Sequence, residues 1–277
     1  MTTAIITLLT DFGLRDGYVA SMKGVILGIC PHARLVDVSH LVPPQDIRSG
    51  AFLLGQVYRS FPAGTVHTAV VDPEVGTGRR ALAMEAGGYF FVAPDNGLFS
   101  WVLKQEGLRR ARSLETAEYR RPEVSATFHG RDVFAPAAAH LANGLDLDAL
   151  GPEGSPSVAP WVTPVEEANR LLGEIVYVDH FGNAITNVRK ADLDRFASLR
   201  ELTISVEGHV ISGLVETYAQ VPPGSAAALI GSGGHLEIAV NRGNASEVLG
   251  IRPGSRMEAA WKPAARSGPV FSPNTRE

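Results

Sequence analysis

The stretch at residues 70–80, VVDPEVGTGRR, places a carboxylate and two guanidinium groups within reach of one another. Asp72 ends a β-branched run, and Arg79 and Arg80 follow a segment rich in proline and glycine. Asp, Pro and Gly are ordinary turn residues, so a plain turn explains this stretch when it is taken alone. The alternative is an arginine folded back beside Asp72, which would make a charge-assisted pair suited to acid–base chemistry.

Further polar clusters follow other apolar runs of the chain. In an open parallel sheet, ligands bind beyond the carboxyl ends of the strands, so we expect these clusters to share one edge. Asp and Asn at strand–helix junctions are often helix N-caps, and Asp132 is predicted to be one. Several such loops on one edge nevertheless favour a ligand site. Their polar residues are Asp11, Asp16, Asp37, His40, Asp95, Asn96, His129, Arg131 and Asp132.

The common cofactor motifs do not occur in the sequence. It has no G-x-x-x-x-G-K-[ST], no G-x-G-x-x-G between a strand and a helix, no H-E-x-x-H and no G-x-S-x-G. The Asp and His residues show no spacing that is diagnostic of a metal site. We therefore predict neither a metal nor a cofactor.

The N-terminal half alternates strand-like and helix-like segments, which predicts an α/β domain with a mainly parallel sheet flanked by helices. The paired glycines at 87–88 predict a hairpin inside RALAMEAGGYFFVAPD. The strand-like segments are 4–9, 34–40, 65–72 and the two halves of 80–95, and the helix-like segments are 16–29, 45–61 and 98–105.

The composition changes at GPEGSPSVAPWVTPVEEA (151–168), where Gly, Pro and Ser dominate, and this segment is the predicted linker. Short strands and tight turns follow at 173–187, 201–213, 225–241 and 255–261, which predicts a smaller all-β barrel domain. The predicted organisation is an α/β domain at 1–155, a β-barrel domain at 170–262 and a disordered tail at 263–277.

Bulk properties narrow the class of protein. The 277 residues carry a formal net charge of -4, so nothing indicates a nucleic-acid partner, and the basic run LRRARS (108–113) is predicted to be a solvated face. The single cysteine, Cys30, excludes an internal disulfide. The N-terminus lacks the pattern of a signal peptide, and no apolar run is long enough to span a bilayer. We expect a cytoplasmic protein without a membrane partner.

Separate motifs, in order, resemble the S-adenosyl-L-methionine (SAM) hydrolases, also called SAM hydroxide adenosyltransferases. This family is related to the fluorinating and chlorinating enzymes that act on the same substrate. The resemblance covers about residues 4 to 260. Its motifs are LLTDFGLRDGYVASMKG, VVDPEVGTGRR, APDNGLF, TFHGRDVFAP, YVDHFGNAITN and GSGGHLEIAVN.

The resemblance implies hydrolysis of SAM by water at ribose C5′, giving adenosine and L-methionine without a cofactor. It implies a homotrimer in which the N-terminal domain of one subunit meets the C-terminal domain of its neighbour at each active site. The family's catalytic Asp, Arg and His fall on Asp72, Arg79 and His129. The family spacing after the aspartate favours Arg79 over the adjacent Arg80.

The same resemblance assigns residues to the substrate. Asp11 matches the ribose ligand, and Asp16 and Asp179 match contacts to the methionine ammonium end. The remaining assignments are Phe181 near the adenine, Asn183 on the adenine edge and Ser232 on the methionine carboxylate. In the halogenating relatives an arginine follows that serine, whereas here Gly233 does, which leaves open how the carboxylate is held.

Three other functions compete with hydrolysis. The halogenating relatives have aromatic residues where Asp72 and His129 stand, so this chain favours the hydrolase. A non-catalytic SAM or adenosine binder would leave Asp72 and His129 unexplained. A metal-dependent phosphoesterase built on the Asp and His loops would lose its activity in EDTA, whereas the hydrolase would keep it.

Overall fold

The computed structural model describes residues 4–167, 169–195 and 202–261. The chain divides into two compact units, Met1–Val162 and Thr163–Glu277, and each is described by itself. The division lies within the segment 151–168 that the sequence marks as a linker. The predicted tail at 263–277 lies outside the described residues.

The first unit is built on a six-stranded sheet with the order β2-β1-β3-β5-β4-β6. Neighbouring strands among β2, β1, β3 and β5 are parallel, and β4 is antiparallel to both β5 and β6. The mainly parallel sheet predicted from the sequence is confirmed. The bounds are β1 Ile5–Thr10, β2 Arg34–Ser39, β3 Val66–Val70, β4 Ala81–Ala86, β5 Tyr89–Pro94 and β6 Arg110–Ser113.

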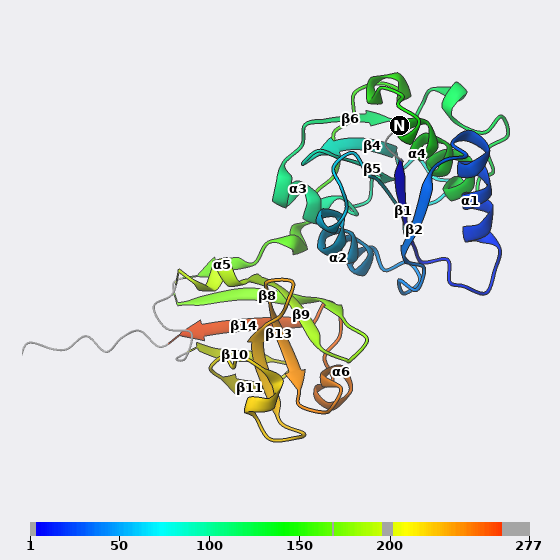
Figure 1. Cartoon of the computed structure of the whole chain (residues 1–277). Helices are drawn as coiled ribbons and strands as arrows, with labels where there is room; N and C mark the ends of the chain where they lie inside the picture. Colours follow the sequence, from blue (N-terminus) through cyan, green and yellow to red (C-terminus); the bar gives the residue numbers. More distant parts are fainter. Residues whose placement is uncertain (1–3, 168, 196–201, 262–277) are drawn as a thin grey trace, which may run out of the picture. The chain divides into compact units, whose positions relative to one another are not determined.

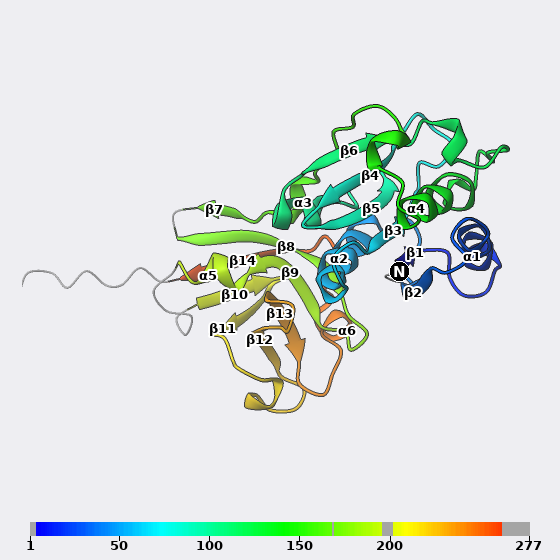
Figure 2. The same ribbon diagram turned by 45° about the horizontal axis from the view of Figure 1, so that its top comes forward.

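Helices cover both faces of this sheet (Figures 1 and 2). On one face, α1 (Tyr18–Ile29) and α4 (Ala135–Ala142) share a core with β1 and β3, and helical spacing brings Met22 and Ile26 of α1 into it. On the other face, α2 (Ile47–Val57) packs on α3 (Ser100–Glu106) through Phe52 and Trp101, whose ring centroids are 6.0 Å apart. These layers leave the carboxyl ends of the parallel strands as one edge that carries loops.

The predicted hairpin between β4 and β5 is confirmed. Gly87 and Gly88 have φ of 59° and 83°, the left-handed region that both central residues of a type I′ turn require. This turn reverses the chain once within an otherwise parallel sheet. It therefore explains why β4 alone runs against its neighbours.

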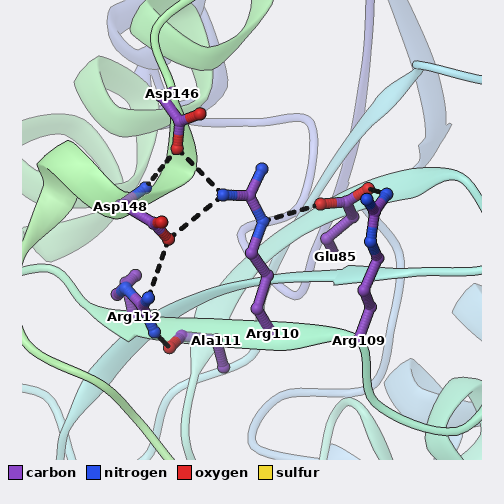
Figure 3. Close-up of polar contacts among 7 residues, drawn as sticks. All are labelled: Glu85, Arg109, Arg110, Ala111, Arg112, Asp146 and Asp148. Atoms are coloured by element: carbon purple, nitrogen blue, oxygen red, sulfur yellow. Dashed lines mark hydrogen bonds and ion pairs between the residues drawn. The ribbon is translucent and has the colours of Figure 1, made fainter.

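An ion-pair network covers the edge strand β6 (Figure 3). Arg110 lies between acids of two segments: its Nε is 2.8 Å from Glu85, and its Nη1 is 2.9 Å from Asp146 and 3.1 Å from Asp148. Arg109 also pairs with Glu85, and Arg112 Nη2 lies 2.8 Å from Asp148. The basic run is therefore largely paired with acids of its own unit. Charges on an edge strand oppose pairing with a second chain.

The start of the predicted linker is ordered against the same edge. Ser113 N donates to Pro152 O at 2.9 Å, and Gly154 N donates to Ala111 O at 3.0 Å. The chain then forms a short 3₁₀ turn at Pro160–Val162 before the second unit begins. Residues 152–154 consequently belong to the first unit.

The second unit is an antiparallel, barrel-like sheet with the order β11-β10-β14-β8-β9-β13-β12, and β7 pairs with β8. Its core is aliphatic and includes Ile175, Ile204 and Ile238. The predicted all-β domain is confirmed. The bounds are β7 Val165–Glu167, β8 Arg170–Val178, β9 Ala184–Arg189, β10 Leu202–Val206, β11 His209–Ser212, β12 Ala226–Ile230, β13 His235–Val240 and β14 Arg256–Trp261, with short helices α5 (Lys190–Leu193) and α6 (Ala245–Leu249).

A buried histidine in β3 makes the stability of the first unit depend on pH. His67 is fully buried beside the rings of Tyr58, Phe61 and Phe91, and its Nδ1 lies 2.8 Å from Thr7 Oγ1. Burial lowers the pKa of His67 to about 4. Between pH 6.5 and 4 the unfolded chain therefore binds a proton that the folded chain excludes.

We expect His67 to remove about 3 kcal/mol from the free energy of unfolding between pH 7 and pH 4. Stability falls as the pH falls, because protonation favours the unfolded chain. The measurement is urea unfolding at a series of pH values for the wild type and for His67→Gln. The variant should lose this component of the pH dependence. Equal pH dependence in both proteins would contradict the assignment.

Candidate active site

A turn after β3 brings Arg79 back toward Asp72. Val75 N donates to Asp72 O at 3.3 Å, and Thr77 N donates to Glu74 O at 3.1 Å. Gly76 has φ of 80°, and a Cβ there would lie 2.5 Å from Ala126 O. Only glycine therefore fits this position without moving the neighbouring loop.

Asp72 and Arg79 form a forked, buried ion pair. Arg79 Nε donates to both carboxylate oxygens of Asp72, at 2.9 and 3.0 Å, and Arg79 Nη2 also donates to Oδ2. Each side chain is 5% exposed. The guanidinium lies over the ring of Phe134, 5.2 Å from its centroid. This fork holds the carboxylate in one orientation.

His129 completes a continuous polar group. Arg79 Nη2 lies 2.9 Å from His129 Nδ1, and arginine has no acceptor, so Nδ1 accepts and the proton of the neutral ring is on Nε2. Burial, and then the positive charge of Arg79, lower the pKa of His129, while the charge of Asp72 acts in the opposite direction. His129 is therefore neutral at pH 7 in this arrangement.

The adjacent arginine has a different partner. Arg80 Nη2 donates to Asp95 and, at 2.6 Å, to Ser155 O. Asp95 Oδ1 also accepts from Ser157 N at 2.7 Å. Of the two arginines that the sequence left as alternatives, Arg79 is the one that contacts Asp72 and His129. Arg80 and Asp95 instead hold the segment that contains Ser155 and Ser157.

The predicted helix-capping role of Asp132 is wrong. Asp132 is fully buried in a π-helical turn, Gly130–Phe134, and it accepts from Ser125 N at 2.9 Å, Arg131 Nε at 2.6 Å and Arg121 Nη1 at 3.1 Å. These contacts lower its pKa, although burial acts against them. Asp132 therefore anchors the loop that carries His129, a role that depends on contacts distant in sequence.

Asp11 follows β1 and lies on the same edge of the sheet. Its Oδ2 accepts from Gln45 N at 2.8 Å. Burial is the main cause that raises the pKa of Asp11, and the negative charge of Asp72 adds to it, while backbone hydrogen bonds act against it. A cationic substrate would relieve this repulsion between two carboxylates. Asp16, further along the same loop, is exposed.

Asp37 and His40, which the sequence grouped with the other polar loops, support the Asp11 loop instead of joining the Asp72 group. Thr10 Oγ1 lies 2.9 Å from His40 Nδ1, and His40 Nε2 lies 3.0 Å from Asp37. Thr10 Oγ1 also accepts from Phe12 N at 3.2 Å. These contacts set the path of the chain as it leaves β1.

In the second unit, the Asp179 carboxylate organises the loop between β8 and β9. Its Oδ1 accepts from Phe181 N and Asn183 N, both at 2.9 Å, and its Oδ2 accepts from Asn183 Nδ2 at 2.8 Å. Gly182 has φ of 84°, and a Cβ there would overlap Asn244. The result is a rigid loop that presents Phe181, whose side chain is 73% exposed.

Ser232 is exposed in the turn between β12 and β13. Beneath this turn lies Glu237, which is buried, accepts from Tyr218 Oη at 2.6 Å and packs against Gly231. Burial raises the pKa of Glu237, and the charge of Asp179 adds to this. Glu237 is not among the site residues predicted from the sequence. A lone acid inside the apolar strand HLEIAV was the available signal.

The structure thus brings together Asp72, Arg79 and His129, with Asp11 close to Asp72, on the first unit. Asp179, Phe181, Asn183 and Ser232 lie on the second unit. Within 4–167, 169–195 and 202–261, no group of three or more His, Cys, Asp or Glu side chains is arranged to hold a metal ion. No helix in these ranges is long and apolar enough to cross a membrane.

Comparison with known proteins identifies the family. Residues 6–151 match the model of the SAM hydroxide adenosyltransferase N-terminal domain, and residues 173–258 match that of the C-terminal domain. The chain belongs to the SAM hydroxide adenosyltransferase family. The family resemblance deduced from the sequence motifs is confirmed.

Several similar proteins match nearly the whole chain. An (R)-S-adenosyl-L-methionine hydrolase of Salinispora tropica is 42% identical over 92% of this chain and 97% of its own length. One from Thermus thermophilus is 43% identical over 89% and 95%. A fluorinase of Nocardia brasiliensis is 28% identical over 92% and 96%. A crystal structure of a Thermotoga maritima protein superposes with a TM-score of 0.84 at 37% identity, covering 92% and 99% of the two chains.

Proposed function

We propose that this protein hydrolyses S-adenosyl-L-methionine to adenosine and L-methionine. The observation that carries the proposal is the buried Asp72–Arg79–His129 group, in a chain whose relatives include (R)-S-adenosyl-L-methionine hydrolases. The sulfonium of SAM is a good leaving group because methionine departs neutral. The enzyme must therefore deliver a water oxygen in line with the C5′–S bond.

Asp72 is the group that holds and orients this water. Arg79 fixes the carboxylate through Nε and Nη2 but leaves lone pairs on both oxygens. As the water oxygen bonds to C5′ and the C5′–S bond breaks, its proton passes to Asp72 and then to solvent. His129 does not take this proton while its Nδ1 accepts from Arg79, so it acts by holding Arg79 in place.

The other residues assigned from the family would bind the substrate. Asp11 accepts from the ribose hydroxyls, and Asp16 and Asp179 attract the ammonium end. Phe181 stacks near the adenine, and Asn183 reads the adenine edge with its Oδ1, because its Nδ2 donates to Asp179. Ser232 holds the methionine carboxylate, without the arginine that follows this serine in the halogenating relatives.

The site residues fall on both units of the chain. Following the family resemblance, we propose a homotrimer with active sites shared between subunits. Sedimentation velocity tests the trimer, and a monomer would contradict it. We further propose that the protein acts in the cytoplasm, without a resident cofactor or metal.

Product analysis tests the reaction. Purified protein incubated with SAM should release adenosine and methionine in equal amounts, detected by liquid chromatography, and EDTA should not change the rate. Production of methionine without adenosine, or complete loss of activity in EDTA, would contradict the proposal. SAM binding without turnover would favour the non-catalytic alternative.

Halides are expected to fail as nucleophiles. A halide beside Asp72 would meet like-charge repulsion and would lose its hydration shell, while Arg79 is already engaged by Asp72. Incubation with SAM in high chloride or fluoride should give adenosine as the only nucleoside product by mass spectrometry. A 5′-halo-5′-deoxyadenosine formed at a rate near that of adenosine would favour the halogenase alternative.

A further inference from the structure

A cavity of about 200 Å³ adjoins the Asp72–Arg79–His129 group within the first unit. Arg79 and His129 form part of its wall, and Arg80, Glu115 and Arg120 supply its other charged side chains. The rest of the wall is aliphatic. The lining therefore includes two members of the candidate catalytic group but not, among the described residues, Asp72 itself.

The three arginines of the cavity differ in their partners. Arg79 is engaged by Asp72 and His129, and Arg80 is engaged by Asp95. Arg120 has neither an ion pair nor a side-chain hydrogen bond among the described residues, and its Nε is buried. A buried guanidinium N–H without an acceptor is costly, and such groups normally have a partner.

We propose that this cavity binds a small inorganic anion through Arg120. A guanidinium makes charge-assisted hydrogen bonds with several oxygens or with a halide, and the cavity volume is sufficient for chloride or phosphate. Glu115, which is exposed at the wall, opposes the anion and limits its affinity. Anion binding at Arg120 does not depend on the proposed hydrolase activity. The effect of the bound anion on catalysis does rest on that proposed function.

An anion on Arg120 would act on the candidate active site through His129. The charges of Arg79 and Arg120 disfavour protonated His129, and those of Asp72 and Asp132 favour it. An added anion would favour protonation. Protonated His129 cannot accept from Arg79 at Nδ1, so the anion would loosen the group that orients Asp72. The anion would therefore inhibit hydrolysis, and the inhibition would grow as the pH falls.

Chloride-35 NMR on the full chain tests the site. Chloride that binds to the wild-type protein should broaden the chloride NMR line, and inorganic phosphate that competes for the same site should reverse this broadening. Arg120→Gln should weaken chloride binding by about tenfold. Glu115→Gln should tighten it several-fold. Arg109→Gln is the matched control, because Arg109 is an exposed arginine outside the cavity, and it should bind as the wild type does.

The second measurement is NMR titration of the His129 ring. Saturating phosphate should raise the pKa of His129 in the wild type and leave it unchanged in Arg120→Gln. Phosphate-reversible broadening that persists in Arg120→Gln would overturn the proposal. If Arg120→Gln does not fold, chloride binding to Glu115→Gln tests the proposal. Tighter chloride binding than in the wild type would support the site, and unchanged binding would reject it. None of these readouts requires SAM turnover, so failure of the proposed function would be seen separately.

Discussion

Replacing Asp72 with asparagine should lower the rate of SAM hydrolysis by about a hundredfold or more while SAM affinity changes little. The amide keeps the shape of the carboxylate and one acceptor for Arg79, but it loses the charge and the basicity that orient a water and take its proton. Among the described residues, Asp72 contacts Arg79 and the turn that follows it. The substitution should therefore leave the proposed substrate-binding residues in place.

The measurements are single-turnover release of adenosine and calorimetric titration with SAM. Asp95→Asn is the matched control, because Asp95 is also buried, with a side chain 4% exposed, and pairs with the neighbouring Arg80. This control should keep turnover close to that of the wild type. Turnover of Asp72→Asn within a few-fold of the wild type would remove Asp72 from the mechanism.

The secondary structure could be predicted from the sequence because its periodicities are clear. Segments whose apolar residues alternate or are continuous form strands in the structure. Met22 and Ile26, which have helical spacing in the sequence, are the buried residues of α1. The Gly87–Gly88 hairpin followed from turn chemistry, which acts locally. These features depend on neighbours in the chain, so one sequence is enough to predict them.

Features that depend on distant contacts were harder to predict. Asp132 has the sequence context of a helix cap, but its partners Ser125 and Arg121 are decided by the fold of the loop. Arg79 and Arg80 are adjacent, and only the direction in which each side chain leaves the turn separates their roles. Arg120 stands in an ordinary Arg–Arg pair, and nothing local distinguishes it from Arg121. The substrate roles of Asp179, Phe181, Asn183 and Ser232 stay predictions.

Removing Arg79 should be the most destabilising change in the candidate site. Arg79→Gln leaves the Asp72 carboxylate buried without its cation, and breaking a buried pair in this way costs about 3 kcal/mol or more of the free energy of unfolding. Arg109→Gln is the matched control, because Arg109 is 73% exposed and its partner Glu85 keeps an ion pair with Arg110 when Arg109 is removed. An exposed charge of this kind contributes about 1 kcal/mol or less.

The double variant Asp72→Asn/Arg79→Gln separates stability from catalysis. Two neutral amides can hydrogen-bond to each other without an unpaired buried charge, so the double variant should lose less stability than the sum of the single variants, by about 1–3 kcal/mol. Hydrolysis should stay at the level of Asp72→Asn, because no carboxylate is restored. Urea unfolding at pH 7 and adenosine release measure the two quantities. Additive losses of stability would show that the fork between Arg79 and Asp72 is not energetically coupled. Recovery of hydrolysis in the double variant would show that Asp72 is not the group that orients the water.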